Sequence, residues 1–455
     1  MQLNQFNTIY FIGAGGIGMS ALARYFNTLG KKVLGYDKTE TALTKLLLDE
    51  GIEIHYNDLG SKVLSLIPDK ENTLVIYTPA VPKVFGELTT CQNEGYTVIK
   101  RAAALGIISK AFETIGVAGT HGKTTTTSIL ANVLSQTKKG CNAFIGGIAT
   151  NFNSNCVLNE NSKRVVLEAD EFDRSFLQLK PNYSIVTSVD ADHLDIYGDG
   201  SAIETSFKDY LDLTNKEGFA VVHADTLEVT KNSSAKLISY GSNKGDFQLI
   251  NYRFKQGKIF FDVKLPTDVW EDVEFGIPGR HNAENALAVL ALCYQLGINE
   301  TIIRDGLASF KGVKRRFEYH VRTEDKIYID DYAHHPTEIE ALLKAVKELY
   351  PTKKLSICFQ PHLFSRTRDF MDGFASALSL ADEVILLDIY PARELPLEGI
   401  TSEALLRMIT AQSKTLVDKT KLADWVKLNQ PELFLTIGAG DIDTCVEPVK
   451  NVMEE

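Results

Sequence analysis

Short apolar runs alternate with helical stretches along the first hundred residues of the chain. The predicted strands are Thr8–Ile12, Lys32–Tyr36 and Leu74–Tyr77. Between the first two, Met19–Phe26 places Leu22, Ala23 and Phe26 on one helical face. Alternation of this kind predicts a mainly parallel sheet with helices on both faces, the α/β class.

The same alternation continues after two interruptions. It pauses around Ala102–Ala111, and the basic stretch Lys311–Arg316 interrupts it again. Residues 219–277 form shorter strands rich in Asn, Gly and Lys, a texture that predicts an antiparallel insertion, and a helix is predicted at Asn282–Leu296. Further strands are predicted at Thr114–Ala118, Val165–Leu167, Tyr183–Ser188, Lys326–Ile329, Leu355–Phe359, Val384–Leu387 and Leu433–Ile437. We therefore expect three α/β domains, at residues 1–108, 109–312 and 313–455.

Composition narrows the class of protein. The 455 residues are 44% hydrophobic and carry a formal net charge of −11, which excludes a wholly disordered chain and argues against binding to nucleic acid or anionic membranes. No apolar stretch is long enough to span a bilayer, and the N-terminus does not resemble a signal peptide. The six cysteines include no Cys-x-x-Cys pair, so we expect reduced thiols in the cytoplasm.

The first glycine loop follows a predicted strand and precedes a helix. Gly13, Gly15 and Gly18 form G-x-G-x-x-G, with Gly16 between them, and Asp37 ends the next strand. Such glycines let backbone N–H groups approach a diphosphate at the positive end of a helix. Taken alone, the loop is compatible with a nicotinamide dehydrogenase or with a tight turn that binds nothing, and it leaves the nucleotide open.

A second loop has the composition of a site that binds a nucleoside triphosphate. It follows the strand Thr114–Ala118 and comprises Gly119, Thr120, His121, Gly122, Lys123, Thr124 and Thr125. A backbone cradle with a Lys ammonium neutralises phosphates, and the Thr hydroxyl after the Lys can hold Mg²⁺. Val117 takes the place of the first glycine in the usual G-x-x-x-x-G-K-[ST] pattern.

Polar side chains follow the next two buried strands. Glu168 ends one strand, and His193 follows the other. Carboxylate and imidazole groups beside a phosphate loop predict Mg²⁺ ligands between phosphates and a second substrate. For Asp173 and Asp190 we prefer a role as helix caps or solvated loop charges.

Taken together, eight motifs give the chain a resemblance to a known family. They are GTHGKTT (119–125), EADEFDRSF (168–176), DADHLDIY (190–197), GRHNAEN (279–285), KRRF (314–317), DDYAHHP (330–336), FQPH (359–362) and DIYPAR (388–393). In this order they resemble the Mur ligases of peptidoglycan synthesis, and among these the branch that adds L-alanine to UDP-N-acetylmuramate.

The resemblance implies a Rossmann-like first domain for the UDP-sugar, a central ATP-binding domain and a Rossmann-like third domain that closes over both. It implies an ADP-producing ligase in which an acyl phosphate of the lactyl carboxylate is opened by the amine of L-alanine, with ATP and two Mg²⁺ ions as cofactors. The first glycine loop would then bind the UDP diphosphate.

The resemblance also implies roles for individual residues. The catalytic residues would be Lys123, Glu168, His193, Arg316 and Asp331, with Thr124, Glu168 and His193 as Mg²⁺ ligands. ATP would contact residues 119–125, His281, Asn282, Asn285, Arg316 and Asp331. The UDP-sugar would contact Gly13, Gly15, Gly16, Gly18 and Asp37, and L-alanine would contact Tyr332, His334, His362 and Arg366.

Several alternatives stay open. Asn282 can simply cap its helix, and of the run Lys314–Arg316 only Arg316 is carried over, since such runs usually form a solvated face. Lys208 is expected to be an exposed helix lysine, and Leu363 stands where many relatives have a basic residue. The rival functions are a recycling ligase that attaches a tripeptide to UDP-N-acetylmuramate, a dehydrogenase, and an ATP-hydrolysing switch.

Overall fold

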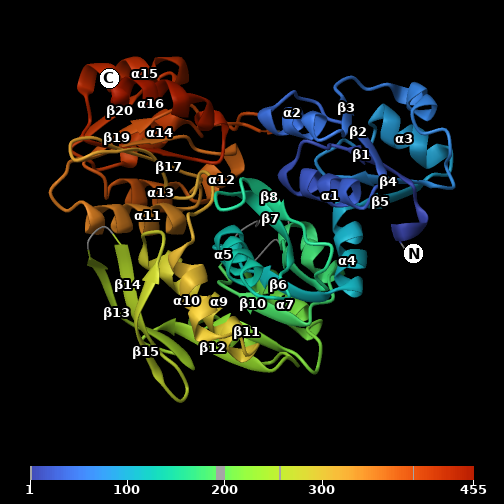
Figure 1. The fold of residues 1–455 in the computed structure, drawn as a ribbon. Coiled ribbons are helices and arrows are strands. Elements are labelled where there is room, and N and C mark those ends of the chain that lie inside the picture. The colour runs from blue at the N-terminus through green and yellow to red at the C-terminus, as the bar shows by residue number, and fades with distance from the viewer. Residues whose placement is uncertain (1–2, 191–199, 256–257, 393) are drawn as a thin grey trace. The chain divides into compact units, whose positions relative to one another are not determined.

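The computed structural model describes residues 3–190, 200–255, 258–392 and 394–455, and these contain three β-sheets (Figure 1). By internal contacts the chain divides into two compact units. The first comprises residues 1–251, 260–275 and 284–311, and the second comprises residues 252–259, 276–283 and 312–455. The first two sheets belong mainly to the first unit, and the third sheet belongs to the second.

The first sheet has five parallel strands in the order β3-β2-β1-β4-β5. Its strands are β1 (Thr8–Ile12), β2 (Lys32–Tyr36), β3 (Glu53–His55), β4 (Thr73–Tyr77) and β5 (Thr97–Lys100). Its helices are α1 (Ile17–Thr28), α2 (Ala42–Asp49), α3 (Gly86–Asn93) and α4 (Arg101–Ala111), with 3-10 helices η1 (Leu3–Gln5) and η2 (Gly60–Ser65). The order, with β1 at the centre, confirms the parallel sheet predicted from the alternating pattern.

The second sheet has ten strands in the order β15-β14-β13-β12-β11-β10-β6-β9-β7-β8. Its strands are β6 (Glu113–Ala118), β7 (Asn142–Ala149), β8 (Ser154–Val157), β9 (Arg164–Glu168), β10 (Tyr183–Val186), β11 (Phe219–His223), β12 (Leu237–Ser242), β13 (Phe247–Lys255), β14 (Lys258–Lys264) and β15 (Val269–Phe275). Its helices are α5 (Lys123–Ser135), α7 (Gly200–Asp212), α8 (Leu227–Thr230), α9 (Arg280–Gln295) and α10 (Glu300–Ala308), with η3 (Phe172–Gln178) and η4 (Ala224–Thr226).

The expectation of an antiparallel insertion over residues 219–277 is wrong for its first half. β11 pairs in parallel with β10, β12 with β11, and β13 with β12. The Asn, Lys and Gly residues that favour hairpins lie partly between these strands, as at Asn243, Lys244 and Gly245, and partly within β13 and β14. Val221 and Val222 of β11 are fully buried, as expected for a strand inside a parallel sheet.

The third sheet has six strands in the order β16-β17-β21-β18-β19-β20, parallel except for the pair β16–β17. Its strands are β16 (Glu318–Arg322), β17 (Ile327–Asp331), β18 (Leu355–Phe359), β19 (Glu383–Leu386), β20 (Ser413–Leu416) and β21 (Leu433–Ile437). Its helices are α11 (Pro336–Leu349), α12 (Phe364–Asp369), α13 (Met371–Leu378), α14 (Ser402–Met408), α15 (Leu422–Asn429) and α16 (Val446–Glu454), with η5 (Lys419–Lys421) and η6 (Asp441–Cys445).

All six cysteines are buried free thiols. Burial raises the pKa of the thiols of Cys91 and Cys293 to about 12 and that of Cys141 to about 11. No disulfide supports the fold, so the apolar cores carry its stability.

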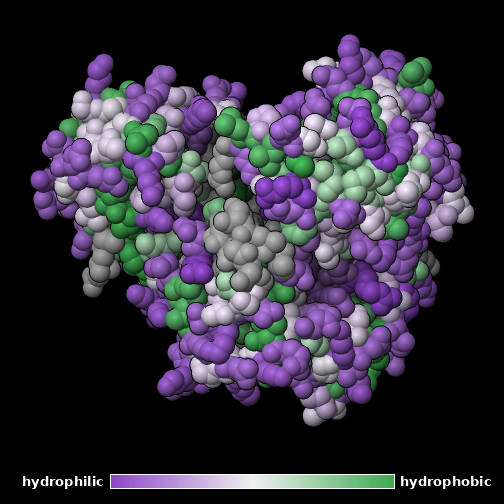
Figure 2. All heavy atoms as spheres, turned by 180° about the vertical axis from the view of Figure 1, so that it is seen from behind, coloured by the Kyte–Doolittle hydropathy of each residue, from purple (hydrophilic) through white to green (hydrophobic). Residues whose placement is uncertain are grey.

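None of the helices in the described ranges is both long enough and apolar enough to cross a membrane. On the face that Figure 2 shows, hydrophilic side chains predominate and hydrophobic ones occur in small groups.

Candidate active site

The second glycine loop lies between the end of β6 and the start of α5. Gly119 and Gly122 have φ angles of 143° and 81°, a region that side chains with a Cβ rarely adopt. A Cβ on Gly119 would overlap the hydroxyl of Thr187, and one on Gly122 would lie 2.7 Å from Oδ1 of Asn285. The loop thus needs glycine at both positions, and Asn285 of α9 lies against it.

Residues after β10 hold the loop in place. Because Val186 pairs with Ala118 in the sheet, the segment after β10 runs beside the loop. Ser188 Oγ accepts a hydrogen bond from the backbone N–H of His121 at 2.9 Å and lies 2.9 Å from Thr120 Oγ1. Sequence analysis missed Ser188, although its place directly after a buried strand was a usable signal.

The ammonium of Lys123 is enclosed by oxygens. Its Nζ donates to the carbonyl of Gly119 at 2.6 Å, to the carbonyl of Thr120 at 3.3 Å and to Glu171 Oε1 at 2.9 Å. Burial alone would lower the pKa of Lys123, but the facing carboxylates of Glu171 and Asp170 outweigh it and raise that pKa. The lysine is therefore a fixed positive charge at the loop.

Glu168 and Thr124 meet at the same place, as the strand-end argument predicts. Glu168 pairs in register with Val117 of β6, so its side chain emerges at the root of the loop. Its Oε1 accepts from Thr124 Oγ1 at 2.9 Å, and its Oε2 accepts from the N–H of Gly146 at 2.6 Å. Burial raises the pKa of Glu168, and the charge of Lys123 opposes that shift.

Thr124 and Glu168 provide the type of donor atom that Mg²⁺ prefers. A hydroxyl and a carboxylate are the hard oxygen donors that Mg²⁺ takes, usually one or two per site beside phosphate oxygens and water. Within the described part of the chain, no three His, Cys, Asp or Glu side chains gather as a complete metal site. The protein donors therefore suit an ion that is completed by a bound polyphosphate. His193, the further predicted ligand, lies outside the described residues.

The two aspartates expected to be helix caps or solvated loop charges differ from each other in the structure. Asp173 is an exposed ion-pair partner of Lys100 at 3.2 Å, as expected. Asp190 is also exposed, but its carboxylate lies 3.5 Å from His121 Nε2, and its backbone N–H donates to Thr120 Oγ1 at 3.1 Å. Asp190 thus belongs to the support of the loop and is more than a solvated charge.

The remaining residues predicted for ATP on α9 lie on its first turn. The side-chain amide of Asn282 donates to the carbonyl of Pro278 at 2.7 Å. This contact supports the local backbone but is not an N-cap, because Asn282 lies inside α9 and an N-cap side chain accepts from the backbone. Gly279 has a φ of 104°, and a Cβ there would lie 2.8 Å from Cε1 of His281. His281 and Asn282 thus have local structural contacts of their own.

The first glycine loop is closed by the acid that the sequence places after β2. Asp37 Oδ2 accepts from the N–H of Gly15 at 2.7 Å. Gly16 is the N-cap of α1, and Gly13 has a φ of 89°. Asp37 therefore shapes the loop directly.

Arg101 lies between the two loops and was not anticipated. A Cβ on Gly18 would overlap its guanidinium, and the same guanidinium pairs with Asp170 at 3.1 Å. Asp170 follows Glu168 by two residues, so Arg101 connects the first glycine loop to the segment beside Lys123. Its position directly after β5 was the available signal.

In the second unit, the backbone around the KRRF motif is fixed by Asp331. Its two carboxylate oxygens accept from the N–H groups of Phe317 at 2.7 Å and Ala333 at 2.8 Å. Burial raises the pKa of Asp331 to about 6, against the opposing charge of Arg316. Arg316 itself lies over the ring of Tyr332, 5.0 Å from its centroid.

The interpretation of Arg315 as part of a solvated face is wrong. Its guanidinium donates to the fully buried Asp330 at 3.1 Å and to the carbonyl of Gly438 at 2.7 Å, and it also lies over Tyr332. Arg315 therefore links the start of this unit to the loop after β21. The partner at residue 438 is too distant in sequence for the motif to reveal it.

Three of the residues predicted to bind the amino acid form an aromatic cluster. His334 makes edge contacts with Tyr332 and His362, at centroid distances of 5.4 and 6.3 Å. Burial lowers the pKa of His334 to about 3, helped by the charge of Arg366. His334 is therefore neutral, and because its Nδ1 lies 3.0 Å from the carbonyl of Tyr332, Nδ1 carries the proton.

Lys208 and Leu363, the two residues that depart from the family pattern, have ordinary local surroundings. Lys208 pairs with Asp212 one turn along α7 at 2.8 Å, which agrees with an ordinary helix lysine. Leu363 adopts a φ of 70° as the N-cap of α12. Its hydrophobic side chain supplies no charge there.

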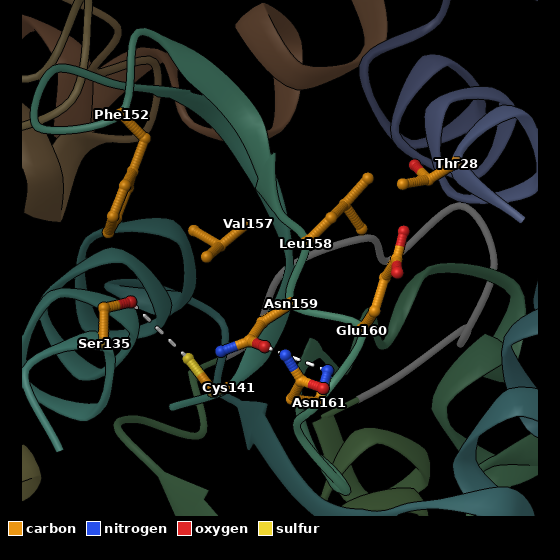
Figure 3. Close-up of a pocket in the computed structure, with 9 residues that line it drawn as sticks. All are labelled: Thr28, Ser135, Cys141, Phe152, Val157, Leu158, Asn159, Glu160 and Asn161. Carbon is orange, nitrogen blue, oxygen red and sulfur yellow. Dashed lines mark hydrogen bonds between the residues drawn. The ribbon is translucent and has the colours of Figure 1, made fainter. Parts of the chain in front are cut away.

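A hollow of about 510 Å³ lies at the other end of α5 (Figure 3). Ser135, the last residue of α5, faces Cys141 there, with Oγ and Sγ 3.9 Å apart. Thirteen helical residues span about 20 Å, so this hollow is separate from the loop at Lys123. It is lined by Thr28, Ser135, Cys141, Phe152, Val157, Leu158, Asn159, Glu160 and Asn161.

Three family models match consecutive parts of the chain. The Mur ligase family catalytic domain matches residues 8–113, the Mur ligase middle domain matches residues 117–293, and the Mur ligase glutamate ligase domain matches residues 315–440. A curated relative from Flavobacterium psychrophilum, UDP-N-acetylmuramate–L-alanine ligase, is 50% identical over the full length of both chains. The chain belongs to the Mur ligase family. A relative of the same name from Flavobacterium johnsoniae is 48% identical, again over both full lengths.

Solved Mur ligase structures agree with this membership. The UDP-N-acetylmuramate-alanine ligase of Thermotoga maritima has a TM-score of 0.83 and 30% identity, with 98% of this chain and 99% of that chain covered. A murein peptide ligase from Psychrobacter arcticus has a TM-score of 0.72 at 23% identity, over 98% of each chain, and shares the fold. The predicted three-domain α/β architecture is thus confirmed.

Proposed function

We propose that this Mur ligase joins the amino group of L-alanine to the lactyl carboxylate of UDP-N-acetylmuramate and converts ATP to ADP and phosphate. The observation that carries the proposal is the 50% identity, over both full lengths, to a relative of that name. The match to this relative spans the positions of all eight motifs. A recycling ligase is less favoured, because the murein peptide ligase structure is only 23% identical.

The charge of Lys123 supports an ATP site at the second glycine loop. A carboxylate and a triphosphate repel each other, so positive charge has to bring them together. Lys123 would neutralise the phosphates, and Thr124 and Glu168 would hold Mg²⁺, which neutralises the phosphate oxygens when bound. We assign a second Mg²⁺ to His193, and Asn282, Asn285 and His281 to the nucleotide.

The glycine loop after β1 is our proposed site for the UDP diphosphate. Gly16 and Gly18 lie at the N-terminus of α1, where backbone N–H groups and the helix dipole favour an anion. Asp37 holds Gly15 and so keeps the loop in a fixed shape.

The third domain is our proposed site for L-alanine. Tyr332, His334, His362 and Arg366 would line the site, and the guanidinium of Arg366 suits the amino-acid carboxylate. A neutral His334 presents a lone pair at Nε2 and would accept a hydrogen bond from the substrate ammonium. Arg316 would reach the γ-phosphate, and Asp331 would hold the backbone beside it.

In this proposal residues 1–108 bind the UDP-sugar, residues 109–312 bind ATP, and residues 313–455 bind the amino acid. We place the reaction in the cytoplasm, in keeping with six buried free thiols and a reducing compartment.

Phosphate release by the purified protein tests the function. We expect release only when ATP, UDP-N-acetylmuramate and L-alanine are all present, with one ADP formed per amide bond. The tripeptide and other amino acids, assayed in parallel, should support much less. Faster turnover with the tripeptide would identify a recycling ligase, and phosphate release from ATP alone would indicate a hydrolytic switch.

A further inference from the structure

Glu171 engages the lysine of the nucleotide loop. Lys123 Nζ lies 2.9 Å from Glu171 Oε1 and 2.8 Å from Oε2. We propose that Glu171 is a positioning residue that holds Lys123 folded against the carbonyl groups of its own loop, so that an incoming nucleotide has to take the lysine from this carboxylate. The inference rests on the ATP site proposed above.

The hydrogen-bonding capacity of the lysine supports this competition. An ammonium has three N–H donors and no acceptor. Lys123 donates hydrogen bonds to three oxygens, the carbonyls of Gly119 and Thr120 and Oε1 of Glu171. The lysine therefore cannot donate to a phosphate oxygen without giving up a contact that it already has.

The pair is strong because it is shielded from water. The Lys123 side chain is 15% exposed and that of Glu171 only 2%. An ion pair on the surface contributes little, whereas charges in a less polar surrounding interact more strongly. Breaking the contact with Glu171 therefore costs free energy and makes nucleotide binding less favourable.

Neighbouring carboxylates are engaged elsewhere, which singles out Glu171. Glu168 accepts from Thr124 and Gly146, and Asp170 pairs with Arg101. Although all three carboxylates add to the field at the lysine, the hydrogen bond to Nζ comes from Glu171.

Glu171 has a second effect once the lysine has moved to the phosphates. Its carboxylate then faces a polyphosphate of the same charge, and like charges repel. Both effects weaken nucleotide binding. Glu171 should therefore lower the affinity for ADP and speed its release after the reaction.

The test is calorimetric titration of the full-length protein with ADP, with and without Mg²⁺. Glu171→Gln keeps the shape and one acceptor oxygen but removes the charge. We expect its Kd for ADP to fall about five- to tenfold, the scale of one charge-assisted hydrogen bond, and a fluorescent ADP analogue to dissociate more slowly. A fold that is merely disturbed would weaken binding instead.

Two controls identify the route of the effect. Asp173→Asn removes one negative charge two residues away, at an exposed site where Asn suits the φ of 53°, and should leave the Kd unchanged. In a Lys123→Met background only the repulsion remains, so Glu171→Gln should tighten ADP binding less than it does in the wild type, because additivity fails for residues in direct contact. Equal tightening in both backgrounds, or none in either, overturns the proposal.

The wild-type protein provides a test that needs no variant. A crystal structure with bound ADP should show Lys123 Nζ on a phosphate oxygen and more than about 4 Å from the Glu171 carboxylate, beyond ion-pair range. An intact pair beside bound ADP would overturn this inference alone. A wild-type protein that binds no ADP would overturn the proposed function itself.

Discussion

Lys123 supplies a single positive charge that no other described side chain of the loop provides. Lys123→Met keeps most of the stem and removes the charge, so the developing phosphate charge loses its stabilisation. We expect kcat to fall by about 10²- to 10³-fold or more, as when one electrostatic group is deleted from an active site. Phosphate release measures it, with the exposed Lys139→Met as control. Normal turnover by Lys123→Met would remove the ATP-loop assignment.

Asp331 makes the stability of the second unit depend on pH. Its pKa in the folded protein, about 6, lies above its ordinary value of 3.8. A raised pKa means that stability from this group is fully present below about pH 4 and is lost as the pH rises through about 6. The loss is at most about 3 kcal/mol, at 1.4 kcal/mol for each pKa unit.

Asp331→Asn should remove this pH dependence and destabilise the unit at low pH. An amide has one acceptor oxygen, so either Phe317 or Ala333 loses its partner. The chain has two tryptophans. In a Trp270→Phe background the fluorescence of Trp425 therefore reports on the second unit during urea unfolding at pH 4 and pH 7. The exposed Asp325→Asn is the control, and an unchanged pH profile in Asp331→Asn would contradict the prediction.

The sequence was sufficient to predict individual site residues where a buried strand ends in a motif. Lys123, Thr124 and Glu168 lie together because β6 and β9 are neighbours and end at the same edge, which alternation and spacing already imply. Arg315 and Glu171 were missed for a different reason. Their contacts with Gly438 and Lys123 depend on the conformation of loops. Neither a run of charged residues nor the spacing of motifs predicts that conformation.

At the scale of elements, strands were predicted well because each buried strand is a short apolar run between turns. β1, β2, β18 and β21 have the predicted ends. Strand direction was harder: residues 219–277 contain the polar and glycine residues of a hairpin region, yet β11 and β12 extend the parallel sheet. Strand direction depends on whether the connection between two strands crosses back over the sheet, and the local amino-acid composition does not show this.

The close contact of α10 with α5 should influence nucleotide binding. A Cβ on Gly306 would lie 2.7 Å from Val133 Cγ2 and 2.8 Å from its Cα, and the Asn132 side chain donates to the Gly306 carbonyl at 2.7 Å. Gly306→Ala would push α10 away from α5, the helix that begins at Lys123. We expect destabilisation of about 1–3 kcal/mol, typical of overpacking, together with weaker ADP binding.

Thermal unfolding and ADP titration check both effects in Gly306→Ala. Asp305→Ala, an exposed neighbour on the same helix, should alter neither. Unchanged stability in Gly306→Ala would mean that the two helices separate freely, contrary to this packing.

For the whole molecule, the proposed site draws residues from both compact units. Lys123 and Glu168 belong to the first and Arg316, Asp331 and Arg366 to the second, so we expect closure on binding ATP and UDP-N-acetylmuramate. Small-angle scattering should show a smaller radius of gyration with both ligands than with neither. Identical profiles would contradict it, and Lys123→Met should close less.

The division into units also marks a limit of sequence reasoning. The basic stretch predicts a boundary near residue 312, and by internal contacts the second unit includes residues 312–455. Residues 252–259 and 276–283 join the same unit although they precede the boundary by many positions. Sequence patterns place these two segments in the same domain as the residues next to them in the chain. Their actual unit depends on which residues they contact in the folded protein, and sequence patterns do not show those contacts.

The buried cysteines make this closure convenient to observe. Alkylation needs an accessible thiolate, and thiols that are shielded from solvent and have raised pKa values react slowly with maleimide dyes. Two cysteines engineered on the surface, one in each unit, should therefore take up a donor and an acceptor fluorophore without prior removal of the six native residues. Single-molecule energy transfer could then follow opening and closing during turnover on the native background.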